Sequence, residues 1–506
     1  MKPIKKYKLN PRGTLQFAVA CGVLSLLSAC VSYSGIESHS KLNNLSTTPI
    51  VDVYGQQNGQ WPDSSWAKNI GGQELQDLID QAISNSPTLQ VAAARINAAR
   101  AASAYVGADK LPKVNGFFEN TYQRFTENGI YPPPLAGNYY SANELALRAS
   151  YDVDFWGKND AEMRSALSLE QVATAEQQSA RLMLSSSIAR TWLQLARQYA
   201  QLDLSIRQLV IRENFDKLIA QRVQAGLDTK SDIQQGLVQV SALKNDISSW
   251  ESAIALSRNQ LAALLGEEPA RGLQIPKPHF EIKQGYELPA NLPLELLSRR
   301  PDIVAARWRV EASQGEIDST KTQFYPNINI IGFAGLSDIG LDTGLERLFK
   351  SGSLAMGIGP SIHLPVFEGG RLRAQLKNKV AGYDIAVATY NQSLTDALHD
   401  VTDQIQTFKT SEIQLKEQAK AEQATKISLQ LAQQRQQAGT ANMLPVLTAE
   451  SALLTQQKQS LDITFRQAES QINLIKALGG GYDSKTQTSN SKTSSATQAS
   501  NKAEAA

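Results

Sequence analysis

The feature that most constrains this chain is an internal repeat, because its second half restates the landmarks of its first half in the same order. Repeats are sought first since they fix the architecture before any single element is assigned. Four motifs recur at an offset of 213 or 214 residues: Pro87 as Pro301, Leu111–Val114 as Tyr325–Ile328, Gln221–Gly226 as Gln434–Gly439, and Leu264–Gly266 as Ala477–Gly479. We therefore interpret the chain as a tandem duplication of a unit of roughly 200 residues.

Each half predicts the order helix, β-hairpin, long helix, turn, helix. In the first half we expect helices over 75–108, over 159–225 and from about 237 to Gly266. The middle one lacks proline and would be ~100 Å long at 1.5 Å per residue. Its apolar residues step by four and three from Ile188 to Leu209, as in helices packed side by side. The second half predicts helices over 301–322, 370–438 and 443–478. A soluble coiled-coil rod would explain these helices equally well.

Two segments alternate between apolar and polar or small residues, as strands do. Residues 353–366 and 144–154 both follow this pattern. Alternating segments of ~10 residues predict a transmembrane β-barrel, but a half-buried soluble sheet gives the same pattern. An open sheet cannot span lipid, because its edge groups would be unsatisfied. Four strands per chain are too few to close a barrel, so a barrel would need several subunits.

The N-terminus predicts export followed by lipid attachment. A basic segment with Lys2, Lys5 and Arg12 precedes an apolar run, which is the layout of a secretory signal peptide. Leu27-Ser28-Ala29-Cys30 resembles the lipobox of bacterial lipoproteins, which implies cleavage before Cys30 and lipid (palmitate among it) on that residue. Val31 follows instead of the Asp that retains such proteins at the inner membrane, so the resemblance implies the outer membrane. A plain signal peptide with an incidental cysteine is the alternative.

Composition excludes several other classes. Lys+Arg 50 nearly balances Asp+Glu 48, which argues against a nucleic-acid partner. Two cysteines and four scattered histidines support neither a disulfide scaffold nor a four-ligand zinc site. There is no phosphate-binding glycine loop, and Asp152 and Asp154 share a strand face without a partner group, so they are more typical of lumen-facing or equatorial acids than of an acid/base pair. We predict no enzyme activity.

Three further motifs, together with the duplication and the lipobox, carry a family resemblance. They are Ser298–Ile303, Phe324–Pro326 before a strand, and the turn Phe367–Arg371. The chain resembles the outer-membrane factor family, the TolC-like lipoproteins of tripartite, resistance–nodulation–division-type efflux pumps, over about 66–478. The resemblance implies an α+β membrane protein. It would be a homotrimer that shares one transmembrane β-barrel, with four strands per subunit, continued by a long periplasmic α-helical barrel. It also implies a periplasmic adaptor (membrane fusion) protein and an inner-membrane transporter as partners, with outer-membrane lipid around the barrel and no cofactor apart from lipid on Cys30.

The resemblance assigns the site residues to the two helix-to-helix turns. The adaptor-docking tip would comprise Arg222, Gly226, Leu227, Arg435, Gly439 and Thr440. The periplasmic gate would comprise Leu444, Asp232 and Thr448. The glycines also suit ordinary left-handed helix caps, Leu444 a core position, and Asp232 a helix N-terminus. Many relatives carry acids where this chain has Pro445 and Thr448, with Glu450 beyond, so we expect a less acidic constriction and leave ion selectivity open.

The predicted function is a passive exit duct for drugs and toxic small molecules. The duct of a type I protein secretion system and a non-conducting lipoprotein scaffold are the alternatives. The predicted organisation is a signal peptide (1–29), a lipid-anchored segment (30–70), a first repeat (71–266), a linker or equatorial segment (267–290), a second repeat (291–480) and a disordered tail (481–506).

Overall fold

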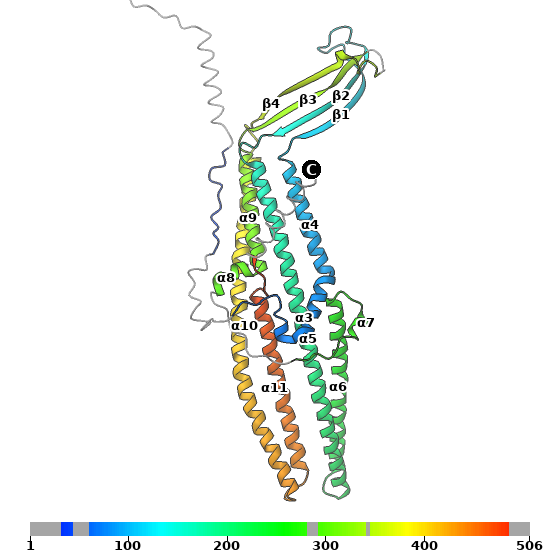
Figure 1. Ribbon diagram of the computed structural model, residues 1–506, viewed down its shortest axis with the longest axis vertical. Helices are drawn as coiled ribbons and strands as arrows, with labels where there is room; N and C mark the ends of the chain where they lie inside the picture. Colours follow the sequence, from blue (N-terminus) through cyan, green and yellow to red (C-terminus); the bar gives the residue numbers. More distant parts are fainter. Residues whose placement is uncertain (1–31, 44–59, 281–291, 341–344, 485–506) are drawn as a thin grey trace, which may run out of the picture. The chain divides into compact units, whose positions relative to one another are not determined.

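The computed structural model describes residues 32–43, 60–280, 292–340 and 345–484. Within them one order of elements occurs twice, first as α4-β1-β2-α5-α6 and then as α9-β3-β4-α10-α11 (Figure 1). The elements are α3 (Lys68–Asn85), α4 (Pro87–Ala108), β1 (Lys113–Arg124), β2 (Tyr139–Asp152), α5 (Lys158–Gln224), α6 (Lys230–Leu264), α7 (Pro269–Gly272), α8 (Leu292–Arg299), α9 (Pro301–Thr322), β3 (Asn327–Gly340), the 3₁₀ turn η2 (Ser351–Ser353), β4 (Leu354–His363), α10 (Arg371–Gln437) and α11 (Leu444–Ala477).

The helix predicted over 75–108 is wrong as a single element. The structure has α3 and α4 instead, separated by Ser86 in an extended conformation. The cause is Pro87, because a proline disfavours the helical conformation in the residue before it and lacks the N–H that the helix would need. Pro87 is instead the first residue of α4, a position where helices tolerate proline.

The chain folds into two compact units. Of the described residues, the first contains those within Met1–Leu42, Ile96–Val172 and Arg307–Thr389, and the second contains those within Asn43–Arg95, Ala173–Ala306 and Tyr390–Ala506. Each unit therefore combines pieces of both halves of the sequence. The predicted repeat boundaries describe the order of the chain and stay a prediction.

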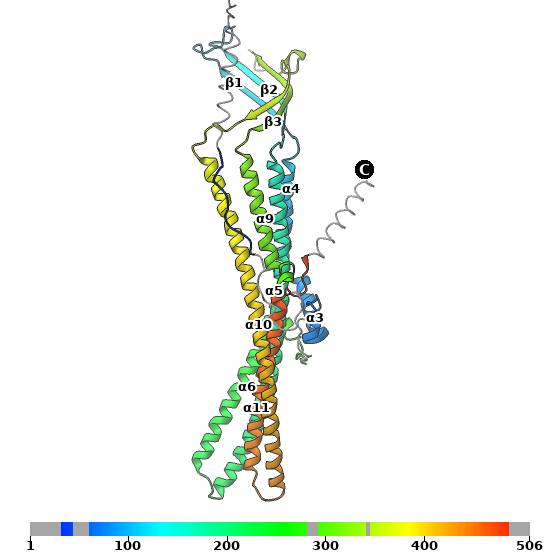
Figure 2. The same ribbon diagram turned by 90° about the vertical axis from the view of Figure 1, so that its left-hand side faces the viewer.

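The first unit contains one antiparallel sheet in the order β1-β2-β3-β4 (Figure 1). Figure 2 shows β1, β2 and β3 of this sheet from another side. Pairing aligns apolar side chains in rows across all four strands, because directly paired residues point to the same face. One such row consists of Phe118, Leu145, Leu336 and Leu354. On this face the β4 side chains are open to the surroundings of the single chain: Met356 is 68% exposed and Ile358 is 84% exposed.

The opposite face of the sheet is polar. Arg148 of β2 forms an ion pair with Glu144, 2.7 Å between Nη2 and Oε1, and its guanidinium lies 4.2 Å from the centre of the Phe117 ring. His363 and Asn327 are paired on the same face. The alternation predicted for the strands is confirmed: one face is apolar and exposed, and the other carries charge.

The main core of the second unit is built around Trp192 of α5. This side chain is fully buried, as are Ile188 and Leu195 one turn to either side. Leu75 of α3, Leu261 of α6 and Ile472 of α11 belong to the same cluster. The predicted side-by-side seam of α5 is confirmed over this stretch, since the three helices meet where its heptad residues lie.

Among the helices of the described residues, none is long and apolar enough to cross a membrane.

Candidate functional site

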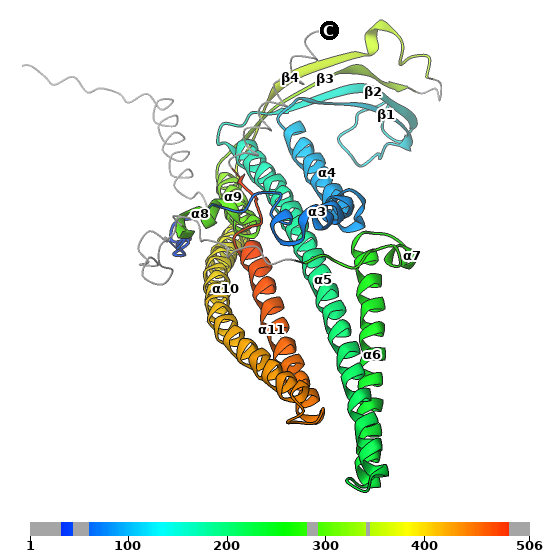
Figure 3. The ribbon, with the colours of Figure 1, turned by 60° about the horizontal axis from the view of Figure 1, so that its bottom comes forward.

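The predicted gate and docking residues lie at the two turns of the second unit. One turn joins α5 to α6 and the other joins α10 to α11. Both turns lie at the lower end of the helices in Figure 3. Residues distant in sequence, Arg222 and Arg435, therefore occupy corresponding places in two successive helical hairpins.

Both turns use the same backbone hydrogen bonds. At the first, Leu227 N donates to Arg222 O (2.9 Å) and Gly226 N to Val223 O (3.1 Å). At the second, Thr440 N donates to Arg435 O (3.0 Å) and Gly439 N to Gln436 O (3.1 Å). This pair of bonds defines the Schellman cap, which requires a left-handed residue. Gly226 and Gly439 supply it, both with φ of 71°.

The side chains of the two turns differ. Arg222 forms a two-pronged ion pair with Asp228, with Nε to Oδ2 at 2.6 Å and Nη2 to Oδ1 at 2.9 Å. The hydrogen bond from Arg222 is the main reason that the pKa of Asp228 is lowered, and the bond to Asp228 raises the pKa of Arg222. Sequence reasoning missed Asp228, although an acid six residues after an arginine across a glycine turn was a visible signal.

Asp232 caps the start of α6. Its Oδ2 accepts hydrogen bonds from Thr229 N (2.8 Å) and from Thr229 Oγ1 (2.7 Å). The Thr229 side chain, followed by its backbone N–H, lowers the pKa of this carboxyl. The spacing Thr-x-x-Asp is a variant of the capping box, in which Glu or Gln usually takes the last position. The carboxylate of Asp232 therefore already accepts hydrogen bonds at the start of its own helix.

Leu444 is the first residue of α11 and is only partly buried, whereas Val446 and Leu447 are buried. Leu447 packs in a cluster with Leu204 and Ile211 of α5 and Leu454 of α11, to which Leu444 does not belong. Thr448 is exposed, and its Oγ1 donates to Leu444 O at 2.9 Å. The core role considered for Leu444 falls instead to Leu447.

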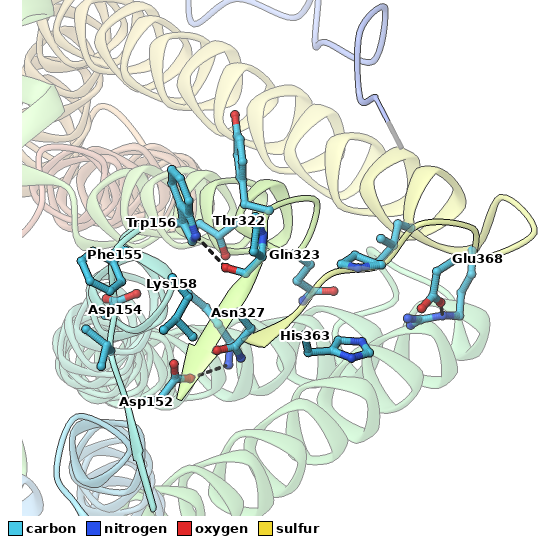
Figure 4. Close-up of a pocket in the computed structure, with 17 residues that line it drawn as sticks. Asp152, Asp154, Phe155, Trp156, Lys158, Thr322, Gln323, Asn327, His363 and Glu368 are labelled. Carbon is cyan, nitrogen blue, oxygen red and sulfur yellow. Dashed lines mark hydrogen bonds and ion pairs between the residues drawn. The ribbon is translucent and has the colours of Figure 1, made fainter. Parts of the chain in front are cut away.

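A second candidate site lies in the first unit, where strands pass into helices. A cavity of about 260 Å³ is lined by residues from both strand-to-helix corners, among them Asp152, Lys158, Asn327 and His363 (Figure 4). Lys158 Nζ lies 4.0 Å from Asp152 Oδ2. Asp154 Oδ2 instead accepts the backbone N–H of Asp160 in the first turn of α5 (3.1 Å). The two acids thus have separate partners, so the corner offers no paired carboxyls.

Aromatic residues hold this corner together. The Trp156 ring stacks on Tyr325, with centroids 4.7 Å apart, and its Nε1 donates to Pro326 O at 2.7 Å. Tyr33 lies edge-on to Phe324, and its hydroxyl is 3.1 Å from that of Tyr325. In the part of the chain that the structure describes, no group of three or more His, Cys, Asp or Glu side chains could hold a metal ion. Cys30 lies outside the described residues.

The chain combines a sheet that has one apolar and one polar face with two long helical hairpins, and this combination can be compared with known proteins. A family model described as "Outer membrane efflux protein" matches residues 78–267 and 292–480. The chain belongs to this family. The match accounts for both halves of the duplication and leaves out the segment between them.

Relatives and solved structures agree with this assignment. The "Multidrug resistance outer membrane protein MdtP" of Shigella flexneri is 29% identical over 470 residues, which is 91% of this chain and 95% of the relative. The "Fusaric acid resistance protein FusA" of Burkholderia cepacia is 32% identical over 73% of this chain and 70% of its own length. The crystal structure of the outer membrane protein VceC from Vibrio cholerae aligns with a TM-score of 0.76 at 34% identity, covering 84% of this chain and 100% of that one. The fold is that of the TolC-like outer-membrane channels.

Proposed function

We propose that this protein is the outer-membrane channel of a tripartite efflux pump. It would be a passive exit duct for drugs and toxic small molecules that arrive from an inner-membrane transporter through a periplasmic adaptor. The observation that carries this proposal is the two-faced sheet attached in sequence to helices of 67 residues, α5 and α10, each ending in a tight turn. Helices of that length span ~100 Å, a distance suited to crossing a periplasm.

The sheet supplies the membrane part of the duct. Its apolar face exposes Leu147, Leu354 and Met356 in the single chain, and lipid is the surrounding in which such a face is stable. Its polar face, with Arg148 and Glu144, would line the lumen. Strands β1 and β4 each have one edge that is unpaired within the described sheet. Since unpaired edges are not tolerated in lipid, three copies would pair these edges and close one shared barrel.

The turns of the second unit supply the gate and the docking surface. In the trimer, Leu444, Asp232 and Thr448 would narrow the periplasmic aperture, while Arg222, Gly226, Leu227, Arg435, Gly439 and Thr440 would meet the adaptor. Leu444 fits a gate because its side chain is only partly buried in its own subunit and is thus available for contacts in the aperture. Adaptor binding would open the tip by favouring the open arrangement, as a ligand does with any two-state element.

Cleavage before Cys30 and lipid on that residue would anchor the chain to the outer membrane. The chain would need no cofactor beyond this lipid, because the transporter supplies the energy. No nucleic acid is a partner, in agreement with a net charge of +2.

The test is deletion of the gene in its native host, followed by measurement of dye and antibiotic accumulation. We expect accumulation to rise and to return to normal when the wild-type gene is supplied. Unchanged accumulation together with the loss of a protein from the medium would instead assign the duct to protein secretion. Unchanged accumulation with a full set of exported proteins would indicate a scaffold.

A further inference from the structure

The two tip turns have the same backbone hydrogen bonds but different charge, since the first is neutral and the second is cationic, so that each serves as a comparison for the other. Arg222 and Arg435 occupy the same position of the two Schellman caps, four residues before the left-handed glycine. Six residues after Arg222 stands Asp228, and six residues after Arg435 stands Ala441. The guanidinium of the first turn is therefore neutralised within the turn, and the second turn lacks the acid that would do so.

Arg435 is isolated in sequence as well as in space. It is the only charged residue between Lys426 and Glu450. Its side chain is exposed and has no ion-pair partner among the described residues, while its carbonyl accepts bonds from Thr440 and Ala441. The second turn thus presents one fixed cation on an otherwise uncharged surface.

A second copy of this chain offers few carboxylates for that cation. At the first hairpin, Asp228 binds Arg222 and Asp232 binds Thr229. Farther up, Glu213 lies 3.7 Å from Lys244, and Asp216 lies 2.7 Å from Arg212. Of the carboxylates nearest the two turns, the one that remains is Glu450, six residues into α11 and so ~9 Å from the start of that helix.

We propose that Arg435 is the charged contact of the docking tip and takes a carboxylate from the helical hairpin of the periplasmic adaptor. The first turn docks without charge, through Leu227, whose side chain is 66% exposed. Arginine suits this role because its planar fork binds a carboxylate through two hydrogen bonds. This inference rests on the proposed function and adds to it the chemistry of the partner and the turn that recognises it.

The test uses the full-length protein in its native host, with a photocrosslinker at Gln436 to measure the yield of adaptor crosslink. Arg435→Gln removes the cation. Ala441→Asp keeps Arg435 but places an acid six residues after it, where Asp228 stands relative to Arg222, so that the cation is neutralised within its own turn. We expect each variant to lower the yield roughly 1.5- to five-fold, the range for one exposed ion pair. Arg435→Lys keeps the charge but not the two-pronged geometry, so it should retain more of the yield than Arg435→Gln does.

A matched change farther along α10 serves as the control. Lys426→Gln removes the exposed cation that precedes Arg435 on the same helix and lies outside the residues placed at the docking tip, and we expect it to leave the yield at Gln436 unchanged. An undiminished yield from both Arg435→Gln and Ala441→Asp would overturn the inference and leave the proposed function standing. A loss with Glu450→Gln equal to that with Arg435→Gln would also overturn it, because it would assign the partner of Arg435 to a neighbouring copy. No crosslink to any adaptor in the wild type, with unchanged dye accumulation on deletion, would contradict the proposed function itself.

Discussion

The carboxylate of Asp216 in α5 lies so close to Gly236 in α6 that a β-carbon on residue 236 would come within 2.5 Å of Oδ1. Asp216 is held there by Arg212, 2.7 Å away and one turn earlier on the same helix. A glycine in a helix interior normally costs ~1 kcal/mol relative to alanine. Here the glycine allows α6 to lie against an ion pair on α5.

Gly236→Ala should therefore lower the thermal unfolding midpoint of the purified protein, because the new methyl group displaces Asp216. In an Asp216→Ala background the same substitution should raise the midpoint, since only the helix-propensity gain of ~1 kcal/mol remains. Circular dichroism of the two single variants and the double variant gives the coupling directly. Equal effects of Gly236→Ala in both backgrounds would contradict the steric explanation.

Leu444→Ser should raise the conductance of the reconstituted channel and the entry of large antibiotics, while leaving the unfolding midpoint nearly unchanged. The reason is that Leu444 is only partly buried in its own subunit. Leu447→Ala is the contrasting variant, because Leu447 is 3% exposed in the α5–α11 cluster. It should cost ~2–5 kcal/mol of stability. If Leu444→Ser leaves conductance unchanged at normal protein levels, Leu444 is not the gate.

Ile36→Ala should release the segment Ser32–Asn43 from its helices. Ile36 is 4% exposed and packs with Ile317 of α9 and Leu376 of α10. A loss of ~2 kcal/mol, the lower end for such a truncation, corresponds to roughly 30-fold faster amide exchange in this segment. Leu42→Ala is the matched control, since Leu42 is 43% exposed and should change nothing. Mass spectrometry of exchanged peptides distinguishes the two variants.

Asp228→Asn should lower stability at neutral pH and have no effect in acid. The pKa of Asp228 is lowered in the folded protein by its hydrogen bond to Arg222. A lowered pKa means that the stabilisation is present above the unfolded value of ~3.9 and is lost as the pH falls through the folded value. The midpoints of wild type and variant should therefore begin to converge as the pH falls below about 4. A difference that stays constant from neutral pH into acid would show that the carboxylate charge is not the cause.

Turn chemistry made several helix ends predictable. Pro301 begins α9 as expected, and the glycines at 226 and 439 follow the ends of α5 and α10 by two residues. These signals are local, because proline and left-handed glycine act on their own backbone. The same rule applied to Pro87 would have divided the first predicted helix correctly.

Side-chain contacts between helices were harder to foresee. The seam of α5 follows the predicted heptad from Trp192 as far as Leu202, which is partly buried against the same core. Ile206, the next expected core residue on that line, is 44% exposed. The buried positions shift to Leu204 and Ile211. A straight helix drifts ~20° per heptad, so a stripe read as strictly seven-fold has turned by ~40° between Trp192 and Ile206, toward the edge of the interface. At the site the turns were visible in the sequence, but the neutralisation of Arg222 by Asp228, a contact within one turn, was not among our predictions.

The duplicated Schellman caps have a consequence for stoichiometry. Three copies of this chain would present six turns of one backbone geometry. A partner that recognises only the shape of the turn would find six equivalent binding positions. Charge divides the six turns into two kinds, three neutral and three cationic. At most three copies of a partner that needs the cation can bind, and six copies bind only if three of them dock without it. Counting adaptors per channel would therefore measure how much of the recognition is shape and how much is charge.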